Sequence, residues 1–137
     1  MEQPIRGSCL CGAVGFEVRR PFLFFQYCHC SRCRKTSGSA HGANILVKAS
    51  QLAWTRGEEH VRRWELPEAQ YFCTGFCNVC GASLPWLGRT GKTYIVPAGA
   101  LDDDPGCAPE RNIYWGSRAA WEAAVGELPT FDEGPPR

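Results

Sequence analysis

Cysteine spacing limits the folds open to this chain more than any other feature of its sequence. Seven of the nine cysteines fall into three short clusters: CxC at 9–11, CxCxxC at 28–33 and CxxC at 77–80. Outside a secreted protein, clustered cysteines are more often metal ligands than disulfide partners. A disulfide scaffold is the alternative, but cysteines two apart on one strand rarely bridge each other, and the total is odd. The pattern therefore favours metal sites.

The first and last clusters are complementary halves of one site. In an extended strand Cys9 and Cys11 point to the same face, so both sulfurs can reach one ion. Cys77, Cys80 and Gly81 form CxxCG, in which glycine tolerates the positive φ that such a turn often needs. Four thiolates would close a tetrahedral zinc site with no position for substrate. Buried free cysteines are the alternative, but packing alone does not require this spacing. We predict a structural zinc here.

The middle cluster differs because it supplies three sulfurs from one short segment. Cys28 and Cys30 share a face, and Cys33 falls in the first turn of a predicted helix, where the positive dipole end favours a thiolate. Three protein ligands and a vacant fourth position are typical of catalytic zinc. A sulfur-rich site makes a poor Lewis acid but suits a fourth sulfur, and a coordinated thiol is deprotonated. The cluster therefore indicates a thiol substrate that adds to an aldehyde carbonyl, or the reverse reaction.

Other reactive side chains stand close to these clusters. Cys73 could supply a fourth ligand at either site or be a buried thiol, and we favour the thiol; Cys107 is a spare. Strand alternation sends His29 to the face opposite Cys28 and Cys30, so it is not a predicted ligand. A basic turn lies beside the ligands of the middle, or second, cluster. It could offset the negative charge of the cluster, hold substrate carboxylates or simply be solvated. Its members are Arg32, Arg34 and Lys35.

Length and charge narrow the class of protein. A chain of 137 residues has room for one core. Fifteen basic and fourteen acidic residues give a net charge of +1, which offers no footprint for nucleic acid or an anionic membrane. The first residues lack a secretory pattern, and no apolar run approaches the about 18–20 residues that span a bilayer. We expect a soluble, cytoplasmic protein with a small-molecule partner; the sequence leaves a homo-oligomer open.

Hydrophobic patterning predicts a mostly β fold. Short runs rich in β-branched and aromatic residues alternate with Gly and Pro, and long helical periodicity is absent. One short helix is predicted from the cap Ser31 to Gly38, and a second over 118–125, capped by Ser117, with Trp121 packed on the sheet. We expect a small zinc-stabilised domain of several short antiparallel strands over residues 4–132, then a tail at 133–137; the proline-rich end from Leu128 should be extended. The predicted strands are 13–18, 22–27, 43–48, 52–56, 61–66 and 93–97.

Several stretches resemble the glutathione-dependent formaldehyde-activating enzyme family, whose relatives include centromere protein V. They are GSCLCGAV, YCHCSRCRKTSGSA, FCNVCG, AGALDD and the closing W…LPTF. The family often has a histidine where this chain has Asn112. The resemblance implies a mostly β fold with two zinc ions: a structural one at Cys9, Cys11, Cys77 and Cys80, and a catalytic one at Cys28, Cys30 and Cys33. It also implies joining of formaldehyde to glutathione as S-hydroxymethylglutathione, which is carbon–sulfur lyase chemistry.

Three functions compete at this stage. The leading one is a zinc-dependent carbon–sulfur lyase that acts on an adduct of glutathione, or another thiol, with an aldehyde. The alternative is a non-catalytic, zinc-stabilised module that binds or carries glutathione. An interaction module like the centromere relative is disfavoured, because the sequence shows no basic or disordered extension.

Overall fold

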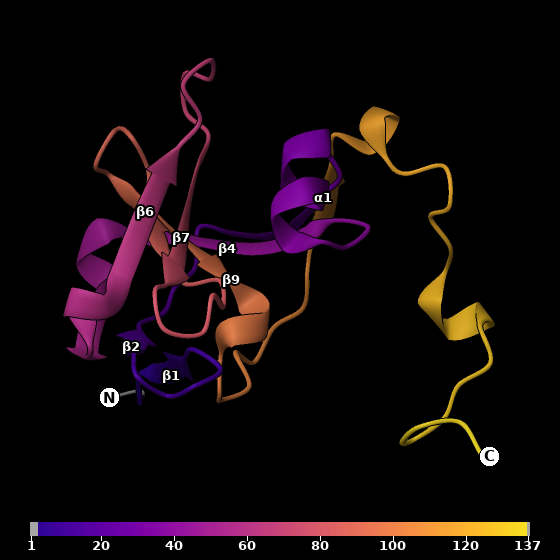
Figure 1. Ribbon diagram of the computed structural model, residues 1–137, viewed down its shortest axis with the longest axis horizontal. Helices are drawn as coiled ribbons and strands as arrows, with labels where there is room; N and C mark the ends of the chain where they lie inside the picture. Colours follow the sequence, from indigo (N-terminus) through magenta and orange to yellow (C-terminus); the bar gives the residue numbers. More distant parts are fainter. Residues whose placement is uncertain (1–2, 137) are drawn as a thin grey trace.

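Three small sheets make up the body of the protein (Figure 1). The structure, a computed structural model, describes residues 3–136, so Arg137, the last residue of the predicted tail, lies outside the described residues. The strand orders are β1-β2-β5, β10-β3-β4-β9-β8 and β6-β7. The strands are β1 (Ile5–Ser8), β2 (Gly15–Val18), β3 (Phe24–Cys28), β4 (Gly42–Lys48), β5 (Leu52–Arg56), β6 (Val61–Glu65), β7 (Cys73–Cys77), β8 (Trp86–Leu87), β9 (Thr93–Pro97) and β10 (Arg111–Ile113).

One hydrophobic core joins the sheets. The alternating residues Val14, Phe16 and Val18 are all buried, as their spacing predicts. They pack with apolar side chains from the central strands β4 and β9 and with two cysteines. The buried members of this core are Cys9, Val14, Phe16, Val18, Phe25, Ile45, Val47, Leu52, Cys77, Leu84 and Val96. Two predicted metal ligands therefore belong to the core itself.

The predicted mostly β fold is confirmed, and its six predicted strands correspond to β2, β3, β4, β5, β6 and β9. The sequence missed four strands, β1, β7, β8 and β10. In β7, Gly75 breaks the apolar pattern; a Cβ there would lie 2.8 Å from the Pro85 carbonyl oxygen, so only glycine permits this close approach. All strand pairs are antiparallel except β10 with β3, which is parallel.

The first predicted helix is present as α1 (Ser31–Ser37) and ends at Gly38 in a left-handed conformation, with φ +62°. Its N-cap is Cys30 rather than Ser31, because the Cys33 N–H donates to the Cys30 sulfur at 3.3 Å. A predicted metal ligand therefore also caps the helix.

The second predicted helix, over 118–125, is wrong. Residues 118–124 have neither helix nor strand and lie between two single 3₁₀ turns, Trp115–Ser117 and Val125–Glu127, and Trp121 is 67% exposed instead of packed on the sheet. An eight-residue helix is not stable in water unless it packs on something, and this segment runs away from the sheets (Figure 1). From residue 129 to 136 the chain has neither helix nor strand, as predicted. Three further 3₁₀ turns lie at Ala49–Gln51, Glu58–His60 and Ala98–Ala100.

Within residues 3–136, the helices are all too short or too polar to cross a membrane.

Candidate metal centres

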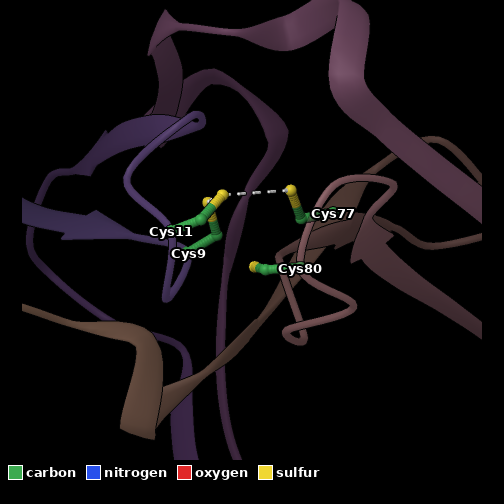
Figure 2. A group of neighbouring side chains, drawn as sticks. All are labelled: Cys9, Cys11, Cys77 and Cys80. Carbon is green, nitrogen blue, oxygen red and sulfur yellow. Dashed lines mark hydrogen bonds between the residues drawn. The ribbon is translucent and has the colours of Figure 1, made fainter.

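The first cysteine cluster joins two loops that are far apart in the sequence (Figure 2). The sulfurs of Cys9, Cys11, Cys77 and Cys80 all lie within 4.8 Å of one another. Between individual sulfurs, Cys9 to Cys11 is 3.6 Å and Cys11 to Cys77 is 4.0 Å. The structure thus brings together the four residues that the spacing grouped.

The two loops achieve this by the same kind of turn. Cys9 and Cys11 lie in the turn between β1 and β2, so the predicted extended strand is wrong: the Gly12 N–H donates to the Cys9 carbonyl at 3.1 Å, and Gly12 has φ +80°. In the second loop the Gly81 N–H donates to the Cys77 carbonyl at 2.8 Å, and Gly81 has φ +77°. Both turns need a positive φ, which glycine adopts without strain.

Backbone N–H groups around the first cluster stabilise thiolates. The Val14 N–H donates to the Cys9 sulfur at 3.3 Å, and the Val79 N–H to the Cys77 sulfur at 3.4 Å. Hydrogen bonds from the backbone at Ala82, and then at Cys11, lower the pKa of Cys80 to about 6. Thiolates are the form that binds zinc, so this environment fits a Cys₄ zinc site.

The pKa values of Cys9 and Cys11, in the same cluster, move in opposite directions. Burial raises the pKa of Cys9, but hydrogen bonds with the Val14 N–H and with the sulfurs of Cys11 and Cys77 outweigh this effect, so the pKa is lowered overall. The Ala13 N–H lowers the pKa of Cys11, but burial and the other three sulfurs raise it to about 11. The pKa of one sulfur is therefore raised while those of its neighbours Cys9 and Cys80 are lowered. A bound divalent cation would favour the thiolate form of every ligand.

The second cluster lies where β3 gives way to α1. Cys28 is the last residue of β3, Cys30 is the N-cap and Cys33 is in the first turn, and their three sulfurs lie within 4.8 Å of one another. The hydrogen bond with Cys33 lowers the pKa of Cys28 to about 6, and the same bond raises that of Cys33. The predicted three-sulfur grouping is thus present, and the pKa values of neighbouring cysteines again move in opposite directions.

A cavity of about 590 Å³ opens over the second cluster and touches all three of its cysteines. Aromatic side chains form much of its wall, and among the described residues that line it Arg32 is the only charged one. The wall aromatics are Tyr71, Phe72, Trp86 and Tyr114. By contrast, a hollow of about 460 Å³ beside the first cluster touches Cys9 and none of the other three ligands. Only the second cluster therefore has its whole ligand set on a cavity.

The wall aromatics were not found from the sequence. Tyr71, Phe72 and Tyr114 lie in loops, and Trp86 lies in a strand of two residues, so no periodic pattern marks them. Tyr114 also has φ +54°, the one positive φ of a non-glycine residue among residues 3–136. Strained backbone of this kind gathers at functional sites, but it cannot be recognised in a sequence.

His29 faces away from the cysteines, as strand alternation predicts. It is buried, its Nε2 lies 2.8 Å from Oδ1 of Asn112, and its ring meets Trp115 edge-on at 4.8 Å. Its backbone N–H donates to the Ile113 carbonyl at 3.0 Å. His29 therefore anchors β10 against β3, which brings Tyr114 to the cavity.

Cys73 and Cys107 belong to neither cluster. Cys73 is buried on β7, its sulfur donates towards the Leu87 carbonyl at 3.8 Å, and burial raises its pKa. The predicted buried thiol is confirmed, although this residue also lines the 590 Å³ cavity. Cys107 is exposed, and all nine cysteines are free, so a disulfide scaffold is excluded.

Comparison with known proteins now decides the family. Residues 4–117 match the model of the glutathione-dependent formaldehyde-activating enzymes. The chain belongs to this family. It is 33% identical over 112 residues to a Halomonas elongata protein named "Putative glutathione-dependent formaldehyde-activating enzyme", covering 78% of this chain and 71% of that protein. A crystal structure of a Rhodobacter sphaeroides protein is similar with a TM-score of 0.59 at 28% identity, covering 77% of this chain and 98% of the other. The family match ends at Ser117, before the closing W…LPTF.

Proposed function

We propose that this protein is a zinc-dependent carbon–sulfur lyase that makes or breaks the adduct of glutathione with formaldehyde. The observation that carries the proposal is the contrast between the two clusters: four sulfurs gather in the first, whereas three sulfurs line a 590 Å³ cavity in the second. The family and the name of the Halomonas elongata relative support glutathione and formaldehyde as the reactants.

Both clusters suit zinc by their donor chemistry. Cys9, Cys11, Cys77 and Cys80 would hold a structural ion, because four thiolates complete a tetrahedral shell. The second cluster, Cys28, Cys30 and Cys33, would hold a catalytic ion with one position left for substrate. Zinc bound there would keep a substrate thiol deprotonated at neutral pH.

Residues of the cavity would bind and orient the substrate. Glutathione carries two carboxylates, and Arg32 is the charged side chain on the cavity wall that can pair with one of them. The aromatic wall excludes water from the reacting sulfur and carbonyl carbon. In the forward direction the sulfur forms a bond to the aldehyde carbon, the C=O electron pair moves to oxygen, and that oxygen takes up the proton released by the thiol.

Amide groups are among the donors available to the aldehyde oxygen. Gln26, Asn44 and Gln70 line the cavity. The Arg111 Nε–H donates to Oε1 of Gln26 at 2.8 Å, which leaves the NH₂ group of Gln26 free to donate. Gln26 is buried, so its amide is held in one orientation.

A second function is favoured by one specific observation. Among the described residues lining the cavity there is no Asp, Glu, His or Lys, so the proton-transfer groups that remain are tyrosines and cysteines. A zinc-stabilised module that binds or carries glutathione without turnover needs none of those four residue types at the cavity.

Exchange spectroscopy by NMR tests both functions. The protein with its metal should accelerate exchange between formaldehyde and its glutathione adduct, and Cys30→Ser should abolish the acceleration, whereas Cys107→Ser should retain it. An exchange rate equal to that in buffer, together with saturable glutathione binding, would replace the enzyme by the carrier. If neither exchange nor glutathione binding is observed, both functions are wrong.

A further inference from the structure

The chain beyond the family match carries apolar side chains that the body does not cover. We call residues 119–136 the C-terminal arm; only its first residue, Ala119, is buried. Its four large apolar side chains, Trp121, Val125, Leu128 and Phe131, are between 52% and 80% exposed. Within residues 3–136, the arm's hydrogen bonds join arm residues to one another. Such a segment is expected to find its partner elsewhere.

The place where the arm leaves the rest of the protein directs the arm away from the sheets of the same copy. Its root is fixed, because Trp115 packs on His29 and Arg118 lies over the Trp115 ring at 4.5 Å. From this root the arm passes along the side of α1 that is opposite to the β6–β7 hairpin (Figure 1). Fully extended, its 18 residues reach about 60 Å, enough to meet another molecule.

A hollow on the other side of α1 offers a surface that suits the arm. This α1 groove, of about 290 Å³, lies between α1 and β7, and Phe72, Phe76, Trp86 and Pro97 form its apolar walls. It shares Cys33, Asn44, Phe72 and Trp86 with the 590 Å³ cavity, so the two hollows adjoin. A side chain bound in the groove would therefore close one side of the cavity.

Charge matches the arm to helix α1, which contributes Cys33, Thr36 and Ser37 to the α1 groove and carries its basic residues beside the groove rather than in its lining. The arm has four acidic residues and, over 119–136, no basic one: Glu122, Glu127, Asp132 and Glu133. α1 has three basic residues and no acidic one: Arg32, Arg34 and Lys35. Opposite potentials of this kind steer two surfaces together and fix their orientation.

We propose that the arm of one copy docks in the α1 groove of a second copy, and that the two copies exchange arms about a two-fold axis. Each copy then completes the other's cavity wall. An aromatic anchor buries about 150–250 Å², and each arm brings two such anchors with two aliphatic ones, so a double exchange falls within the about 1,200–2,000 Å² of a stable interface. Exchange of identical elements is a common route to symmetric dimers.

Sedimentation equilibrium of the full chain with its metal tests the association. We expect a dimer, and we expect the double variant Trp121→Ser, Phe131→Ser to dissociate at least ten-fold more readily, with unchanged zinc content and circular dichroism. Trp64→Ser is the matched control, because Trp64 is also exposed but lies on β6, outside the α1 groove. Added salt should weaken the dimer through the charged contacts.

Cross-linking identifies the occupant of the α1 groove. A photoreactive residue placed at Phe131, in a mixture of isotopically light and heavy protein, should give light–heavy cross-links to α1 or β7. A monomer at all concentrations, a double variant as dimeric as the parent, or cross-links within one copy would each overturn the proposal. Because mass and cross-links do not depend on turnover, this outcome is separate from that of the lyase assay.

Discussion

The two cysteine clusters place the same side chain in different surroundings. In the first, ligands 66 residues apart meet at the edge of the hydrophobic core, where Cys9 and Cys77 are buried and Cys11 is exposed, and a metal there would tie the N-terminal turn to the end of β7. In the second, all ligands come from residues 28–33, at the end of β3 and the start of α1, and they line a cavity. A metal bound by ligands far apart in the sequence therefore links distant parts of the fold, whereas a metal bound within one short segment does not.

The two clusters also differ in which residues adopt a positive φ. Gly12 and Gly81 supply the positive φ angles of the first cluster at no steric cost. Beside the second cluster the positive φ belongs to Tyr114, where a side chain on the cavity wall is kept despite its strain. This difference fits the proposal that the first site serves stability and the second contact with a ligand.

The largest expected effect is that of Cys77→Ser. Structural zinc contributes about 10–16 kcal/mol in small domains, which is as large as the about 5–15 kcal/mol of typical total stability. We expect the variant to lack zinc and to show no cooperative thermal unfolding by circular dichroism. Cys107→Ser, which changes an exposed cysteine, is the control and should change the free energy of unfolding by less than about 0.5 kcal/mol. A Cys77→Ser protein that unfolds cooperatively would show that the first cluster is not structural.

Removing a ligand from the second cluster should have a smaller effect on the fold. Cys30→Ser is the cleanest change, since serine replaces the helix N-cap as well as any residue can. We expect the zinc content to fall from two ions to one per chain, with loss of adduct exchange and retention of cooperative unfolding. Cys28→Ser should give the same metal loss. If either variant unfolded as thoroughly as Cys77→Ser, the division between the clusters would be wrong.

The effect of Arg32→Gln should fall mainly on substrate binding. A charge-assisted hydrogen bond is worth about 1.5–3 kcal/mol, so the KM for glutathione should rise about 10–100-fold with kcat little changed. Lys35→Gln is the matched control, because Lys35 lies on the same helix but does not line the cavity. An equal KM in the parent and Arg32→Gln would remove Arg32 from the binding site.

The smallest effects test the contrast in strain. Space around Gly81 is open, so Gly81→Ala should lower the free energy of unfolding only through its positive φ, by about 1–2 kcal/mol. Tyr114→Gly should leave it within about 1 kcal/mol of the parent but weaken glutathione binding. Chemical denaturation and a binding titration measure the two quantities. A strong loss of stability in Tyr114→Gly would mean that this residue supports the fold rather than the ligand.

Much of this arrangement could be predicted from local patterns. The spacing of Cys28, Cys30 and Cys33 places three sulfurs together in almost any strand-to-helix junction, and Val14, Phe16 and Val18 identify their strand by alternation. Tertiary placement could not be predicted in this way. Residues 118–125 have a helical pattern but no surface to pack on, and the cavity wall is assembled from loops by long-range pairing such as Ile113 with Cys28.

The parallel pairing of β10 with β3 has a consequence for biosynthesis. Strand β3 and all ligands of the second cluster leave the ribosome at least 79 residues before Asn112, the residue that locks His29 in place. The first cluster is complete once Cys80 has emerged, before Trp86 and Tyr114 have emerged. During synthesis, the thiols at 28–33 are therefore without their cavity for most of the time that the nascent chain is exposed to cellular metal and oxidant. A metal acquired early, or a chaperone that shields these thiols, would protect the site in that interval.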